Sequence, residues 1–284
     1  MRSDPSAEQA QLRAVLCRRF PSLPGAGWQF SLTQGLSGDN WRAQNGDSVT
    51  ILLRPITLQR HHLGIDRRRE GRALRMGAAA GLGPTCYGAV DGWLLAGWLP
   101  GETLAPGALS TAQLAALVVR LHRLPPRLTA RSLRRYCAAY WAQLAPGRRG
   151  FLAQRVHRRW QRRREPRPLK LALLHMDIHD GNLIDADGAV GLIDWEYAAS
   201  GDIALDLAAL SRNYALNGAG RAGLVAAYCR HGGYSDAARL LHQLNRWLGW
   251  VDYMAWLWFE LRWQQTQQPI YRQQADVLLR NLTQ

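Results

Sequence analysis

The chain has 284 residues, 47% of them hydrophobic, and this composition predicts a globular protein of one large domain or two lobes rather than a disordered chain. The formal net charge is +15, almost all of it from arginine. No run of about twenty apolar residues is present, so we expect no membrane span. The N-terminus contains acids and no apolar block, and the four cysteines lack metal-type spacing. These features exclude a signal peptide and predict a cytoplasmic protein.

The basic residues concentrate in two stretches, 60–75 and 155–170. Such clusters can bind nucleic acid, but neither stretch has the alternating aromatic residues of an RNA-stacking surface. We therefore expect solvated helix faces and no nucleic-acid partner, with a polyanion-binding surface as the alternative. A basic cleft would also attract ATP.

Residues 1–99 show a mixture of helix and strand patterns. The elements predicted by periodicity and turn signals are a helix at 8–20, strands at 28–33 and 48–54, a helix at 66–80 and a strand beginning at Gly92. Between the first two strands lie Gly35, Ser37 and Gly38. A glycine turn at this point would let backbone N–H groups approach phosphates, and an ordinary hairpin is the alternative.

The predicted strand at 48–54 ends in Arg54, a cation that can bind phosphates through its guanidinium fork. Glu70 on the following helix is placed to face back toward Arg54, although it could instead form a solvated pair with Arg67 or with Arg72 to Arg75 of its own helix. Backbone groups from Ala96 to Leu99 would lie against an adenine. These residues predict a nucleotide-binding lobe at 1–99, which ends at a connector that contains Pro100 and Gly101.

Residues 100–284 are predicted to form a larger, mainly helical lobe. Helices are expected at 111–124, 131–145, 150–164, 219–231, 235–247, 248–265 and 268–282. A further helix opens after Asp202, a natural N-cap. The overall expectation is an α+β fold with a small β-rich N-terminal lobe and a larger helical C-terminal lobe.

The central stretch, residues 173–206, contains His175, Asp177, Asn182 and Asp194 in the pattern H-x-D-x-x-x-x-N followed by I-D. Phosphoryl transfer needs a carboxylate to accept the proton of an attacking hydroxyl, and Asp177 is the candidate. It also needs oxygen ligands for Mg²⁺, which Asn182 and Asp194 can supply. A β-hairpin between these two ligands is predicted to bring Asp194 back beside Asn182.

Two rival interpretations of the central stretch remain open. His175, Asp177 and His179 resemble the His/Asp cluster of a metallohydrolase, but that interpretation leaves Asn182 and Asp194 unexplained. Asp185 and Asp187 could form part of a calcium loop, although the later ligands are missing and turn chemistry is the simpler explanation. His175 can also be a hydrogen-bonded structural histidine.

The C-terminal 38 residues are rich in aromatic side chains. Trp256, Glu260 and Trp263 fall on one helical face, and two indoles around a carboxylate would suit a flat, positively charged organic substrate. Core or surface packing is the alternative. Glu196 and Asp202 are further acids that could offset the charge of such a substrate against the positive chain.

The central motifs resemble the aminoglycoside phosphotransferase and choline kinase family, relatives of the protein kinases. Its catalytic loop matches His175 to Asn182, its metal aspartate matches Asp194 within I-D-W-E, and its G-D-x-x-x-D-L-A motif matches 201–208. The resemblance implies a kinase-like fold, ATP and Mg²⁺, with Asp177 as base and His175 in a structural role. It also implies that Arg54 replaces a usual lysine, which leaves the phosphate contact and the partnership with Glu70 open.

Within that family, further motifs resemble the bacterial thiamine kinases. They are GLSG near residue 35, REPRPL at 164–169, LIDWEYA, GDIAL and the tryptophan-rich tail. This resemblance implies transfer of the ATP γ-phosphate to the hydroxyl of thiamine, by a monomer. Choline or an aminoglycoside is the alternative acceptor, although few acids are available for a polycation. A non-catalytic basic binding protein is the remaining alternative.

Overall fold

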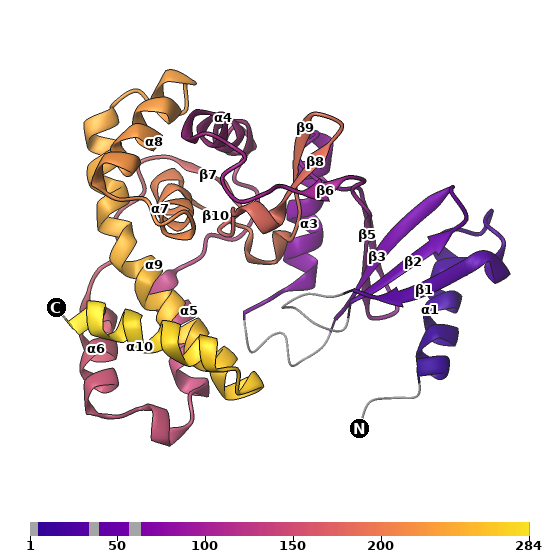
Figure 1. The fold of residues 1–284 in the computed structure, drawn as a ribbon, viewed down its shortest axis with the longest axis horizontal. Helices are drawn as coiled ribbons and strands as arrows, with labels where there is room; N and C mark the ends of the chain where they lie inside the picture. Colours follow the sequence, from indigo (N-terminus) through magenta and orange to yellow (C-terminus); the bar gives the residue numbers. More distant parts are fainter. Residues whose placement is uncertain (1–4, 34–39, 57–63, 284) are drawn as a thin grey trace.

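The computed structural model describes residues 5–33, 40–56 and 64–283. Within these residues the N-terminal part is an antiparallel sheet of five strands in the order β1-β2-β3-β5-β4, with helix α1 packed beside it (Figure 1). The bounds are α1 Pro5–Arg19, β1 Trp28–Leu32, β2 Trp41–Asn45, β3 Val49–Pro55, β4 Cys86–Val90 and β5 Trp93–Gly97. Apolar side chains of α1 and the sheet share one core, which includes Leu12, Leu16, Trp28, Ile51 and Leu53.

Helix α3, Arg67–Ala79, connects the sheet to the rest of the molecule. Asp66 caps its N-terminus by accepting hydrogen bonds from the backbone N–H groups of Arg68 and Arg69. The helix packs against β4 and β5 and against the turn Trp195–Tyr197 of the central stretch. Gly77 permits this close packing, because a Cβ there would lie 2.5 Å from the Trp195 ring.

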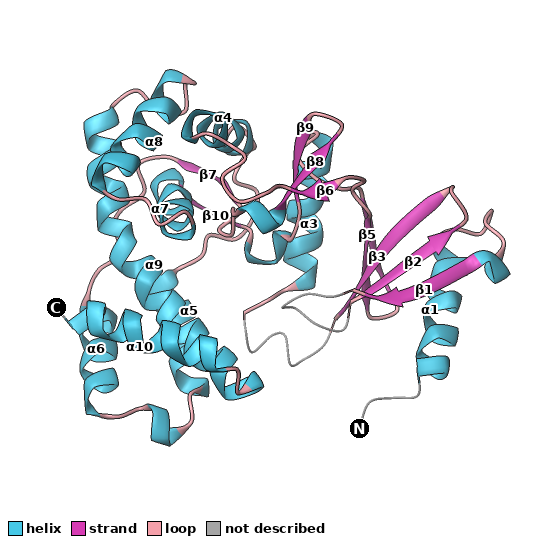
Figure 2. Ribbon diagram, viewed as in Figure 1, coloured by secondary structure: helices cyan, strands magenta, loops and turns pink. Residues whose placement is uncertain are grey.

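The C-terminal part is mainly helical, as Figure 2 shows by colour. Its helices are α4 Thr111–His122, α5 Leu133–Gln143, α6 Phe151–Arg162, α7 Ile203–Asn213, α8 Gly218–Arg230, α9 Ala237–Thr266 and α10 Pro269–Thr283. Its short strands are β6 Glu102–Thr103, β7 Leu171–Leu174, β8 Leu183–Ala186, β9 Ala189–Leu192 and β10 Ala199–Asp202. Helices α5, α7 and α10 all pack against α9, which forms the spine of this part.

The predicted break near residue 248 was wrong, because residues 237–266 form one continuous helix. Gly249 lies inside α9, where the Trp160 ring packs so closely that a Cβ would lie 2.4 Å from it. Strand β4, Cys86–Val90, was not among the predicted elements; it pairs with β5 with a register shift between Cys86 and Gly88. No helix among the described residues is long and apolar enough to cross a membrane.

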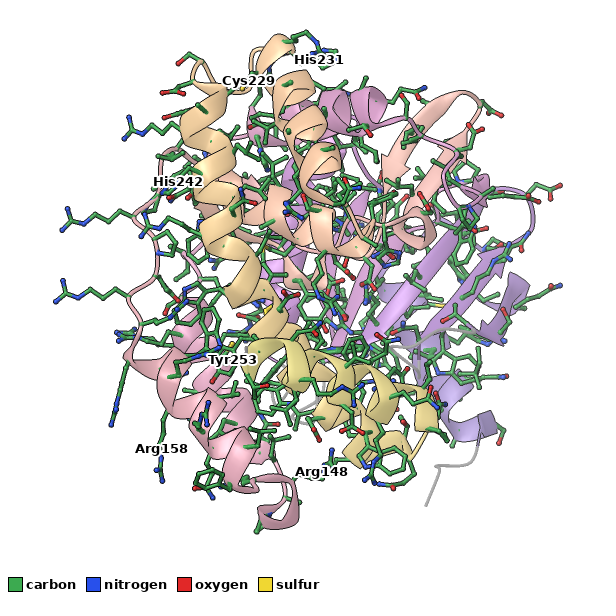
Figure 3. All side chains as sticks on the ribbon, turned by 60° about the vertical axis from the view of Figure 1, so that its left-hand side comes forward. Arg148, Arg158, Cys229, His231, His242 and Tyr253 are labelled. Carbon is green, nitrogen blue, oxygen red and sulfur yellow. The ribbon has the colours of Figure 1, made fainter. Side chains whose placement is uncertain are left out.

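The basic stretch at 155–170 is largely the solvated helix face that we expected. Its arginines are exposed, and Figure 3 shows Arg158 of α6 pointing away from the ribbon. The stretch at 60–75 does not behave in the same way, because Arg67 is buried.

Candidate phosphoryl-transfer site

His175, the first residue of the H-x-D-x-x-x-x-N motif, is held in a fixed position beside the site. It follows β7 and is fully buried, with its ring edge-on to Trp195 at 5.0 Å between centroids. Nε2 lies 3.0 Å from the carbonyl oxygen of Ile193 and must carry the proton, because a carbonyl can only accept. Burial lowers the pKa of His175. The neutral ring therefore ties the start of the loop to the end of the β8–β9 hairpin.

Asp206, in helix α7, anchors the backbone of the same loop. Its Oδ2 accepts from the backbone N–H of His175 at 3.0 Å, and its Oδ1 accepts from that of Met176 at 2.7 Å. His122 Nε2 lies 3.1 Å from Oδ2. Although burial favours the neutral acid, the bonds from His122 and the backbone lower the pKa of Asp206. This anchor also holds Met176 at φ 70°, a left-handed conformation.

The predicted β-hairpin is confirmed and returns the chain to the loop. Leu183 pairs with Leu192, and the N–H of Ile193 donates to the carbonyl oxygen of Asn182 at 3.0 Å. The next residue, Asp194, takes a left-handed conformation with φ 60°. Asn182 and Asp194 therefore meet at one site, as the sequence predicted.

Asp177 and Asn182 are joined directly. The Nδ2 of Asn182 donates to the carbonyl oxygen of Asp177 at 2.9 Å and to its Oδ2 at 3.1 Å. His179 Nε2 lies 3.8 Å from the same Oδ2, and its interaction with Asp177 raises the pKa of His179. The Asp177 carboxylate is thus oriented by an amide and lies near a histidine.

Arg54 lies on β3 and forms ion pairs with three carboxylates from two segments of the chain. Its Nη1 lies 2.8 Å from Glu70 Oε1, and its Nη2 lies 2.7 Å from Asp194 Oδ1 and 2.8 Å from Glu196 Oε2. Burial works against the charge of Arg54, but these carboxylates raise its pKa. The predicted Arg54–Glu70 contact is therefore present.

Arg67 completes this network from a buried position, whereas the sequence analysis offered it only as a solvated alternative partner of Glu70. It is 2% exposed, and its Nη1 contacts both Glu70 Oε2 and Glu196 Oε2, the latter at 3.0 Å. The spacing of Arg67 and Glu70, three residues apart on one helix, was the signal for this pair. Burial and then the charge of Asp194 raise the pKa of Glu196 to about 7, whereas Arg54 lowers that of Asp194 despite its burial.

Arg54 and its three carboxylate partners line one side of a cavity of about 1210 Å³ between the sheet and the helices. The sequence-predicted residues that line it are Arg54, Glu70, Ala96, Leu99, Asp177, Asn182, Asp194 and Glu196. The lining also includes aromatic and apolar residues that the sequence analysis did not select, among them Tyr140, Tyr197, Met254, Trp258 and Phe259. Trp258 Nε1 donates to the hydroxyl oxygen of Tyr197 at 3.1 Å, so two of these rings are fixed to each other.

Asp202 does not lie at this cavity. It is 2% exposed and caps α7, with the N–H of Ala204 donating to its Oδ1. Its Oδ2 accepts from Gln243 Nε2 at 2.8 Å and from Trp247 Nε1 at 2.9 Å. Its carboxylate is thus used inside the helical core.

The three predicted residues of the α9 tail also lie away from the cavity lining. Trp256 is fully buried in the core. Glu260 is 2% exposed, and Arg148 binds both of its carboxylate oxygens at 2.7 and 2.8 Å; Figure 3 labels Arg148. Trp263 packs under the guanidinium of Arg272, 5.8 Å from the ring centroid. The cavity receives the opposite face of α9, where Trp258 and Phe259 lie.

The predicted phosphate loop residues Gly35, Ser37 and Gly38 lie outside the described residues. At the other nucleotide segment, the N–H groups of Gly97 and Trp98 already donate to the carbonyl oxygens of Thr85 and Thr50. An adenine at this edge would therefore use other backbone groups between Ala96 and Leu99.

The donor set fits a small, hard cation better than zinc. The described residues contain no group of three or more His, Cys, Asp or Glu side chains that could hold a metal ion. Asn182 has its Nδ2 engaged with Asp177, which leaves its Oδ1 as the acceptor, and the Asp194 side chain is 26% exposed. One amide oxygen and one carboxylate match the few protein ligands that Mg²⁺ takes in phosphoryl-transfer sites.

Comparison with known proteins places this site in a family. Residues 31–244 match the model of the phosphotransferase enzyme family. Thiamine kinase from Salmonella newport is 35% identical over 277 residues, covering 94% of each chain. Thiamine kinase from Salmonella typhi has the same identity and coverage.

Solved structures share the fold. Choline kinase LicA from Streptococcus pneumoniae is 16% identical with a TM-score of 0.71, over 96% of this chain and 99% of that one. The GDP complex of aminoglycoside 2'-phosphotransferase-IIIa is 14% identical with a TM-score of 0.62, over 96% and 98%. The predicted kinase-like fold class is confirmed by these likenesses. Together with the sequence matches, they show that the chain belongs to the phosphotransferase enzyme family.

Proposed function

We propose that this protein is an ATP-dependent kinase that transfers a phosphoryl group to the hydroxyl of thiamine. The observation that carries the proposal is the meeting of Asp177, Asn182 and Asp194 beside the Arg54–Glu70 pair, at one cavity. The identity of 35% over 94% of the chain with thiamine kinases supports thiamine as the acceptor. We place the nucleotide-binding lobe at 1–99 and the acceptor-binding lobe at 100–284.

Asp177 is the proposed base. Asn182 orients its carboxylate through the bond to Oδ2, so that the other oxygen can accept the proton of the attacking hydroxyl. Asn182 and Asp194 would hold Mg²⁺, which when bound neutralises the phosphate charge. Arg54 is the proposed phosphate contact in place of a lysine, and Glu70 orients it.

The aromatic lining of the cavity gives a flat cationic acceptor a surface. Tyr197 and Trp258 are held together by their hydrogen bond, and Phe259 lies beside them in the cavity lining. We propose that these rings, rather than Trp256 and Trp263, face the acceptor. Aromatic faces attract organic cations, which offsets the repulsion expected from the chain's net charge of +15.

The test measures ADP released from Mg-ATP with thiamine, choline or kanamycin as the acceptor. Asp177→Asn removes the base, and Asp185→Asn changes an exposed aspartate near the end of β8 as the matched control. We expect thiamine-dependent turnover that only Asp177→Asn abolishes. Turnover with choline or kanamycin alone would support the kinase chemistry and refute thiamine as the acceptor. No acceptor-dependent turnover would refute the proposed function.

A further inference from the structure

Glu196 and Glu70 each serve two guanidinium groups. Glu196 Oε2 lies 2.8 Å from Arg54 Nη2 and 3.0 Å from Arg67 Nη1. Glu70 contacts Arg54 through Oε1 and Arg67 through Oε2. Both carboxylates therefore keep one cation when the other cation moves away.

Arg54 uses Nη1 for Glu70 and both hydrogens of Nη2 for Asp194 and Glu196, so its Nη2 end cannot bind a phosphate while it keeps both of these carboxylates. The Nη2 group that bonds Glu196 is the same group that bonds Asp194 Oδ1, at 2.7 Å. Asp194 is a proposed Mg²⁺ ligand, and its carboxylate would turn from Arg54 to the cation. Release of Asp194 frees one Nη2 hydrogen, but for Arg54 to turn toward a phosphate with both Nη2 hydrogens it must also leave Glu196.

We propose that Arg67 is a positioning residue for Arg54, which holds Glu196 and Glu70 so that Arg54 can release Asp194 and bind the nucleotide phosphates. Without Arg67, Glu196 would have Arg54 as its partner in this network and would keep it bound. The inference rests on the proposed function, since it assumes that a magnesium nucleotide binds here.

The position of Arg67 suits this role. It is 2% exposed and stands at the first turn of α3, three residues before Glu70 on the same helix. Its Nε and Nη2 atoms are buried and have no hydrogen-bond partner among the described residues. It therefore retains donors that can follow the Glu196 carboxylate when Arg54 moves.

The test measures the dissociation constant of Mg²⁺ with AMP-PNP, a non-hydrolysable ATP analogue, by calorimetry. Arg67→Met is compared with Arg68→Met, which removes the same charge from an exposed position on the same helix turn. We expect Arg67→Met to weaken Mg-AMP-PNP binding about tenfold. This figure assumes that Arg54 is released from Glu196 in only about a tenth of the variant molecules, because the apparent affinity scales with the fraction of molecules that can bind. Arg68→Met should bind like the wild type, and the KM for the acceptor should stay unchanged in both variants.

A double variant separates this role from a merely structural one. Glu196→Gln removes the negative charge that competes with the phosphates for Arg54. In that background Arg54 is released in most molecules even without Arg67. Adding Arg67→Met should therefore weaken nucleotide affinity less than about threefold. The proposal would be overturned if Arg67→Met lowered the affinity for Mg-AMP-PNP equally in the wild-type and Glu196→Gln backgrounds. Wild-type affinity in Arg67→Met would also overturn it. Should Arg67→Met not fold, Arg67→Gln takes its place with the same expected directions, because a neutral amide also removes the second cation from Glu196. A wild type that binds no Mg-AMP-PNP would instead refute the proposed function.

Discussion

Replacing Asp206 by Asn tests whether this buried carboxylate holds the catalytic loop. Asp206 is 1% exposed and accepts from His122 and from the backbone N–H groups of His175 and Met176. Asn keeps one acceptor oxygen but turns an N–H₂ group toward a donor. Hydrogen bonds to a charged group contribute about 1.5–3 kcal/mol each, and removing one partner of a buried pair costs about 3–5 kcal/mol.

We therefore expect Asp206→Asn to lower the free energy of unfolding by about 3–5 kcal/mol. The assay is urea unfolding at pH 7, followed by tryptophan fluorescence. Asp236→Asn is the matched control, because Asp236 caps α9 at an exposed position and its loss should cost no more than about 1 kcal/mol. Equal midpoints for the two variants would refute the reasoning that Asp206 anchors the loop.

Three further outcomes follow from the structure. Asp177→Asn should lower kcat by about 10²–10⁴-fold and leave the dissociation constant of Mg-AMP-PNP nearly unchanged, and a matching loss of nucleotide affinity would contradict its role as base. Glu260→Gln should lower the urea midpoint and leave the KM values for thiamine and ATP unchanged, because Glu260 binds Arg148 rather than substrate. A selective rise in the KM for thiamine would instead indicate that Glu260 contacts the acceptor. Burial and the charge of Arg149 lower the pKa of His157 to about 4. Between pH 6.5 and 4 the unfolded chain therefore binds a proton that the folded chain does not, and the free energy of unfolding falls on acidification. His157→Gln should reduce that fall, and an unchanged pH dependence of stability would refute this role of His157.

The parts of the site that the sequence predicted are those with local spacing signals. Asn182 and Asp194 are joined by a hairpin whose turn residues are visible in the sequence, so their meeting followed from local structure. Arg54 and Glu70 also met, because a strand ending and a helix face constrain where each side chain lies. The α+β fold class followed from the same periodicities.

The parts that were missed depend on tertiary packing. Helix α9 is buried on several sides, so periodicity alone did not show that Trp258 and Phe259, rather than Trp256 and Glu260, face the cavity. Glu260 gains its partner from Arg148, more than a hundred residues earlier. The buried role of Arg67 was hidden because its neighbours in the sequence are also arginines, and only the fold brings Glu196 to it.

The most direct test of the account is the identity of the product formed from Mg-ATP and thiamine. The ³¹P spectrum of the reaction should show a phosphate ester split by a neighbouring CH₂ group, formed in equal amount to ADP and absent with Asp177→Asn. ADP accompanied only by inorganic phosphate, or an ester that still forms at the wild-type rate in Asp177→Asn, would contradict the account.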